Sequence, residues 1–202
     1  MKRKKTWIQI GCAAAILLAL AAHYMFEPWG FYRKVSQQES EKRLSLVAAA
    51  EAYLGTNEAD GSYRVILERY NAQPVLPQGY ALQDSDSWCA AFVTVAAMDA
   101  GLSQRIPPEC GCQRQIGLWQ GLGSWQEDDG YIPQPGDIIY DDFDENRLRD
   151  CTGWSDHVGI VVGVKWPFIK VIEGNWSDAV CSRVLFINDI HIRGYGLPDY
   201  SL

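Results

Sequence analysis

An alanine-rich run behind a cysteine places the tightest constraint on how this chain folds. Residues 89–100 read Cys-Ala-Ala-Phe-Val-Thr-Val-Ala-Ala-Met-Asp-Ala, and Gly101 follows as a helix stop. So many small side chains predict a buried helix that packs closely against a sheet. Asp86 or Ser87 can cap its first turn, which puts Cys89 at the helix N-terminus. The helix dipole favours a thiolate there, although many buried cysteines are inert.

Helical patterns fill the first part of the chain, and strand patterns fill the last part. Apolar residues recur at helical spacing on both sides of the cysteine, whereas short runs bounded by turn residues follow Pro135-Gly136. The expected helices cover residues 39–54, 63–71, 89–100 and 113–122, and the expected strands cover 137–140, 158–164, 169–173, 180–187 and 191–195. Helices followed by an antiparallel meander predict an α+β fold. We expect one domain, residues 39–202, since this length can bury a sizeable core.

The first 26 residues have the pattern of a signal peptide or a membrane anchor. A basic cluster at residues 2–5 precedes an apolar run from Trp7 to Phe26, which as one helix is about long enough to span a bilayer. Residues 19–21 offer a cleavage site, whereas the aromatic and basic residues of the linker, 27–38, suit an uncleaved anchor, which we favour slightly. Both interpretations predict export. The protein is then either anchored in the membrane with its domain outside the cell, or secreted to the cell wall.

The charge of the exported part limits its partners. Without residues 1–21 the chain has 14 basic and 25 acidic residues, a net charge of −11. So acidic a domain argues against nucleic acid as a partner and against an anionic membrane surface as a target. Any membrane contact is expected through the N-terminal apolar segment, and we expect a monomer.

Four of the six cysteines lie outside the apolar segment and the start of the cysteine helix: Cys110, Cys112, Cys151 and Cys181. An even number suits an oxidising compartment. Cys151 and Cys181 flank the same meander, so we predict a disulfide between them, with Cα atoms within about 7 Å. Cys110 and Cys112 resemble a redox pair or half a metal site but lack ligands at zinc-like spacing. We therefore expect no metal and no cofactor. We make no prediction of disulfide partners for Cys110 and Cys112.

His157 begins an apolar strand and is the expected partner of the helix-start cysteine. Alternation along the strand puts Gly159 and Gly163 on the same face as His157, which would let the alanine-rich helix approach. The next strand places Glu173 and Asn175 together on one face, and either can hold the imidazole in its working tautomer. A plain polar turn formed by the same two residues is the alternative.

Five short motifs occur in order along the chain: Trp-Cys-Ala-Ala-Phe-Val at 88–93, Pro-Gly-Asp-Ile-Ile at 135–139, Asp-His-Val-Gly-Ile-Val at 156–161, Val-Ile-Glu-Gly-Asn at 171–175 and Arg-Gly-Tyr-Gly-Leu-Pro at 193–198. Their joint order and spacing resemble the CHAP domain family of cysteine- and histidine-dependent amidohydrolases and peptidases, over roughly residues 40–200. The resemblance implies a papain-like fold, related to NlpC-type peptidases. It also implies cleavage of an amide bond in bacterial peptidoglycan, by an N-acetylmuramoyl-L-alanine amidase or an endopeptidase.

The resemblance also implies roles for single residues. Cys89 would be the nucleophile, His157 the base, and Glu173 with Asn175 the polar pair that orients the imidazole. The substrate would be the peptidoglycan stem peptide. The sequence departs from better-known members because it has no recognisable wall-binding module and no aspartate-rich calcium loop before the cysteine.

The oxyanion donor and the class of reaction stay open at this level. Gln83 precedes Cys89 by six residues, the interval at which papain-like enzymes place their oxyanion glutamine, and Tyr80 is its rival. A catalytically silent wall-binding or scaffold domain would keep the same fold, but it has no need of an intact cysteine, histidine and polar pair. Acyl transfer or transpeptidation differs from hydrolysis only in the acceptor.

Overall fold

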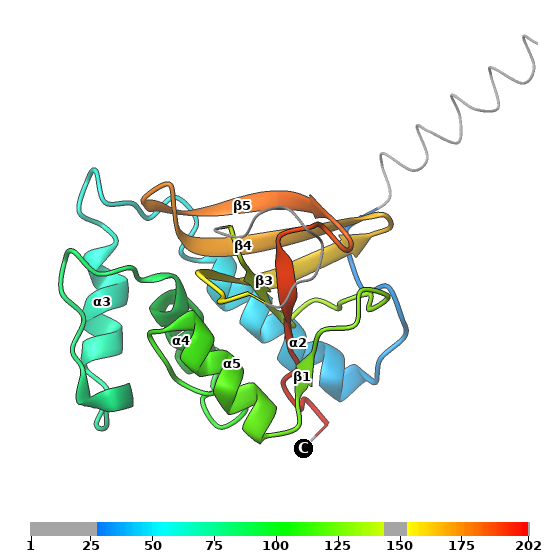
Figure 1. Cartoon of the computed structure of the whole chain (residues 1–202), viewed down its shortest axis with the longest axis horizontal. Helices are drawn as coiled ribbons and strands as arrows, with labels where there is room; N and C mark the ends of the chain where they lie inside the picture. The colour runs from blue at the N-terminus through cyan, green and yellow to red at the C-terminus, as the bar shows by residue number, and fades with distance from the viewer. Residues whose placement is uncertain (1–27, 144–152, 202) are drawn as a thin grey trace, which may run out of the picture.

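The computed structural model describes residues 28–143 and 153–201 and has the predicted α+β class (Figure 1). Its helices are α2 (Gln37–Glu51), α3 (Arg64–Asn71), α4 (Cys89–Asp99) and α5 (Cys112–Gly121), with a 3₁₀ turn at Pro77–Gly79. The strands are β1 (Trp125–Gln126), β2 (Ile138–Asp141), β3 (His157–Lys165), β4 (Phe168–Trp176), β5 (Ala179–Phe186) and β6 (Ile192–Gly196). They form one antiparallel sheet in the order β1-β6-β2-β3-β4-β5.

Helix boundaries follow local capping chemistry. The Ser36 hydroxyl accepts a hydrogen bond from the Glu39 N–H at 3.1 Å, so α2 begins two residues earlier than the sequence pattern predicts. Gly101 ends the cysteine helix as predicted, with a left-handed φ of 71°. In the described part of the chain, no helix is both long and apolar enough to cross a membrane. The predicted apolar helix at residues 1–26 lies outside the described residues.

Helix α4 is the centre of the main core. Its first nine residues are all buried, and they pack against β3 and β4. The helix approaches closely at Gly174 of β4, where an added β-carbon would lie 2.5 Å from Cβ of Phe92 and 3.0 Å from the Trp88 ring. The alanine-rich sequence and this one glycine therefore together allow the helix to lie directly on the sheet.

The prediction that Gly159 and Gly163 admit the helix is wrong. The β3 residues that face α4 are Val158, Ile160 and Val162, members of the same buried cluster. An added β-carbon at Gly159 would meet the side chain of Glu173 at 2.6 Å, and one at Gly163 would meet Trp29 at 2.8 Å. Gly159 lies between Val158 and Ile160, on the face of β3 that points away from α4, and the register of β3 against β4 shifts between Val161 and Gly163.

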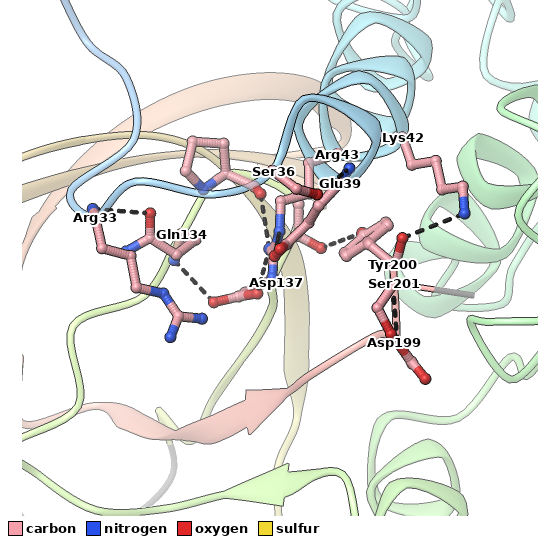
Figure 2. Close-up of polar contacts among 12 residues, drawn as sticks. Arg33, Ser36, Glu39, Lys42, Arg43, Gln134, Asp137, Asp199, Tyr200 and Ser201 are labelled. Atoms are coloured by element: carbon pink, nitrogen blue, oxygen red, sulfur yellow. Dashed lines mark hydrogen bonds and ion pairs between the residues drawn. The ribbon is translucent and has the colours of Figure 1, made fainter.

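A buried ion pair ties α2 to the turn before β2 (Figure 2). Arg43 donates a hydrogen bond to Asp137 Oδ1 at 2.8 Å, and the Tyr131 hydroxyl donates to Oδ2 at 2.6 Å. The guanidinium also lies over the Tyr200 ring, 4.5 Å from its centroid, and the Tyr200 hydroxyl donates to the Gly136 carbonyl. The aspartate of the Pro-Gly-Asp motif therefore has a structural role.

Replacing Asp137 with alanine should lower the free energy of unfolding by about 3 kcal/mol, because it removes the buried partner of Arg43 and leaves only the more exposed Glu39 beside the buried guanidinium. Denaturant unfolding of purified protein measures this. The matched control is Asp84→Ala, which breaks an exposed pair with Arg64 and should cost at most about 1 kcal/mol. Equal losses in the two variants would contradict the role given to Asp137.

Candidate active site

The residue before Cys89 is held by polar contacts from two other segments. The Trp88 backbone N–H donates to Asn175 Oδ1 at 3.4 Å, and its indole N–H donates to Glu58 Oε1 at 2.9 Å. The Asn175 amide also donates to Glu58, at 3.2 Å. Cys89 then begins α4, where backbone N–H groups lack partners inside the helix. The structure thus places Asn175 against the start of the cysteine helix, where its side chain binds Glu58 and the backbone of the residue before the thiol rather than the His157 ring.

His157, the first residue of β3, lies between Cys89 and Glu173. Its Nε2 atom is 3.7 Å from Glu173 Oε1, and its ring interacts with the Cys89 thiol. Burial disfavours the charged ring, but the hydrogen bond and negative charge of Cys89 and the negative charge of Glu173 outweigh burial and raise the pKa of His157. The arrangement therefore favours an imidazolium at the position where a cysteine base is needed.

Cys112 is a part of this site that the sequence analysis did not identify. It is the first residue of α5, and its sulfur lies 3.5 Å from the sulfur of Cys89. The hydrogen bond from Cys112 and the interaction with His157 lower the pKa of Cys89 well below its ordinary value, although burial of the thiol opposes this shift. The same contact raises the pKa of Cys112, so Cys112 keeps its proton and donates it toward the Cys89 thiolate.

Replacing Cys112 with alanine should therefore raise the pKa of the Cys89 thiol. The measurement is the rate of Cys89 alkylation by iodoacetamide against pH, with the labelled peptide identified by mass spectrometry. Its midpoint should move to higher pH in Cys112→Ala and move less in Cys112→Ser, which keeps a donor. An unchanged midpoint in Cys112→Ala would show that Cys112 does not stabilise the thiolate.

Asp141 is a second feature that the sequence analysis missed. It pairs with His157 in the β2–β3 register, is 1% exposed, and has no hydrogen-bond donor on either carboxyl oxygen among the described residues. Burial and the nearby Glu173 carboxyl raise the pKa of Asp141 well above its ordinary value. Burial raises the pKa of Glu173 as well, and its oxygens also lack a hydrogen-bond donor among those residues, but the His157 ring and the Arg183 guanidinium lie within salt-bridge range of its carboxyl, with Arg183 Nε 3.2 Å from Oε2. We therefore assign the proton to Asp141 and the charge to Glu173.

A cavity of about 270 Å³ opens over the cysteine pair. Cys89 and Cys112 lie on its wall, and Gln78, Arg114 and Trp154 give it a mixed polar and aromatic lining. A larger hollow of about 590 Å³ lies between residues 103–108 and 117–122 and contains none of the candidate catalytic residues. The smaller cavity is therefore the one that can bring a substrate to the thiol.

The two candidate oxyanion donors are bound to their own loop in this structure. The Tyr80 hydroxyl and the Gln83 backbone N–H both donate to Asp86 Oδ2, at 2.8 and 2.7 Å. The Gln83 side chain donates to the carbonyl of Ala81. Gln78 lines the cavity and donates to Glu109 Oε1 at 2.5 Å. An oxyanion role for Gln83 or Tyr80 stays a prediction that needs a rearrangement of this loop.

The predicted disulfide cannot be placed, because Cys151 lies outside the described residues. Cys181 is on β5, opposite Glu173 in the register, and forms no disulfide with a described residue. The bridge stays a prediction.

No protein-family model matches the chain, and no curated protein matches it. Among solved structures, "The crystal structure of Ly7917" matches at 14% identity and a TM-score of 0.43, covering 77% of this chain and 62% of that chain. A second, "The crystal structure of Ly7917 with the hydrolyzing product of MDP", matches at 13% identity with the same TM-score and coverage. The chain thus spans less than two thirds of the length of these structures, and likeness at this level carries no conclusion about its fold or function.

Proposed function

We propose that this protein is an exported cysteine hydrolase of the CHAP type, with a papain-like arrangement of helices and sheet, that cleaves an amide bond of bacterial peptidoglycan. One observation carries the proposal. The Cys89 thiol, with its lowered pKa, interacts with a His157 ring that faces the buried Glu173 carboxyl, and the thiol lies on the wall of an open cavity. A scaffold protein would not need these groups together.

The chemistry follows from the charges around the thiol. His157 takes the Cys89 proton, and the thiolate attacks the carbonyl carbon of the scissile amide. The free backbone N–H of Cys89, at the start of α4, is placed to donate to the oxyanion. His157 then returns its proton to the leaving amine, which leaves a thioester on Cys89. Attack by water on the thioester releases the acid and restores the thiol.

The choice of peptidoglycan rests on two features of the sequence. The five motifs resemble a family that acts on this polymer, and the apolar segment from Trp7 to Phe26 would deliver the domain outside the membrane. Acyl transfer to another amine uses the same thioester, so it is the competing reaction.

Mass spectrometry of fragments from purified peptidoglycan tests the proposal. An amidase would release whole stem peptides with a new L-alanine amine, whereas an endopeptidase would leave shortened stems on the muramic acid. A parallel incubation with an added amine, such as glycinamide, detects acyl transfer as a mass increase on the released acid. The matched control is enzyme alkylated at Cys89. No new amine in any fragment would overturn the proposal.

A further inference from the structure

An exposed apolar cluster surrounds the turn that joins β3 and β4. Phe168 and Phe186 face each other across β4 and β5, with ring centroids 4.8 Å apart. Trp166 is 61% exposed, Val184 55% and Phe186 57%. We call these four residues the hairpin patch. Large apolar side chains gathered in this way on a surface are typical of an interaction site.

The chain enters the fold beside the hairpin patch (Figure 1). Gly30 and Val164 exchange backbone hydrogen bonds, at 3.4 and 2.9 Å, directly next to the β3–β4 turn. Trp29 packs over Gly163, where an added β-carbon would lie 2.8 Å from the Trp29 Cβ atom. The residues that precede this point include the apolar run 7–26. A membrane segment there would bring the bilayer to the same end of the sheet.

We propose that the hairpin patch rests in the interfacial zone of a lipid bilayer that residues 7–26 span. Tryptophan suits this zone, because its ring has an apolar body and a polar N–H, while the phenylalanine and valine side chains of the patch supply apolar area to bury. Lys165 and Lys170, beside the patch, can bury their stems and keep their charges in water. Since the domain is strongly acidic, burial of apolar area drives the contact rather than attraction to anionic headgroups.

Strand β3 separates the hairpin patch from the candidate active site. His157 is its first residue and Lys165 its last, so the two ends are about 26 Å apart along the strand. Docking at the Lys165 end would direct the Cys89 cavity away from the bilayer. The proposal does not depend on the proposed amide hydrolysis, but it would orient such an activity toward a polymer outside the membrane.

Photo-cross-linking of the full chain tests this contact. The protein is reconstituted into phosphatidylcholine vesicles that contain a phosphatidylcholine with a diazirine near its headgroup, and mass spectrometry locates the labelled residues. We expect at least about tenfold more label on the hairpin patch than on Trp154, which is 75% exposed beside the Cys89 cavity. Equal labelling of Trp154, or no label on the patch, would overturn the proposal.

A double variant separates lipid contact from other causes. In Trp166→Ser with Phe186→Ser, both changes are on exposed side chains, and the label on Phe168 and Val184 should fall several-fold. The control Leu122→Ser changes a side chain of similar exposure outside the patch and should leave the labelling unchanged. Thermal melting confirms that each variant is folded. Unchanged labelling in the double variant would instead exclude the bilayer as the occupant of the hairpin patch.

Discussion

Cys89→Ser should abolish amide cleavage, lowering the rate on the order of 10⁴-fold or more, while the fold survives. The serine hydroxyl is nearly isosteric with the thiol but does not ionise near neutral pH. The three groups that stabilise a thiolate at this position, Cys112, His157 and the Ala90 backbone N–H, therefore have no anion to act on. Release of soluble fragments from purified peptidoglycan gives the rate, and thermal melting confirms the fold.

Two other cysteines provide matched controls for this experiment. Cys110→Ser and Cys181→Ser change thiols whose pKa is raised by burial, so neither thiol is activated for attack. Both variants should keep near wild-type cleavage. If Cys89→Ser clears peptidoglycan at the wild-type rate, or if Cys110→Ser is the inactive variant, the assignment of Cys89 as the nucleophile is wrong.

The order of the four helices and of β2 to β6 could be predicted from the sequence, because each depends on a local pattern, whereas the two-residue strand β1 was missed. The alanine-rich run with Gly101 behind it predicted α4, and turn residues predicted the strands of the meander. The packing of β3 could not be predicted in the same way. The helix packs on the face of β3 that carries Val158, Ile160 and Val162, and tertiary packing rather than a local pattern selects that face.

The site was likewise predictable only in part. Cys89, His157 and Glu173 carry motifs that draw attention, and the structure brings them together. Cys112 and Asp141 were missed because each joins the site through tertiary structure alone. Cys112 reaches the nucleophile from another helix, and Asp141 reaches the imidazole through strand pairing. A single sequence gives no signal for either contact.

Glu173→Gln should lower kcat/KM on the order of 10²-fold, because the imidazolium loses the nearest carboxylate. Glu173 raises the pKa of His157, so its loss lowers that pKa. The reaction needs a protonated His157, and its rate falls as pH rises through the pKa of this group. The alkaline limb of the pH profile should therefore move to lower pH in Glu173→Gln. A purely structural role for Glu173 would not move this limb.

Asp141 provides an internal check on this assignment. Without the Glu173 charge, the pKa of Asp141 should fall, and an ionised Asp141 can partly replace the lost carboxylate. Asp141→Asn alone should therefore have a small effect, whereas the double variant with Glu173→Gln should lose more than the two single losses combined. Strict additivity would mean that the two carboxyls act independently.

Asn175→Ala is the competing variant, and it should reduce the rate less than Glu173→Gln does. Asn175 supports the Trp88 backbone N–H, so its loss loosens the start of α4 without removing charge from the imidazolium. Its φ of 58° is left-handed, so alanine there adds a backbone cost of about 1–2 kcal/mol. Asn175→Gly removes that cost and isolates the side-chain effect. If both Asn175 variants are more damaging than Glu173→Gln, and the alkaline limb stays in place, an asparagine orients the imidazole and Glu173 does not.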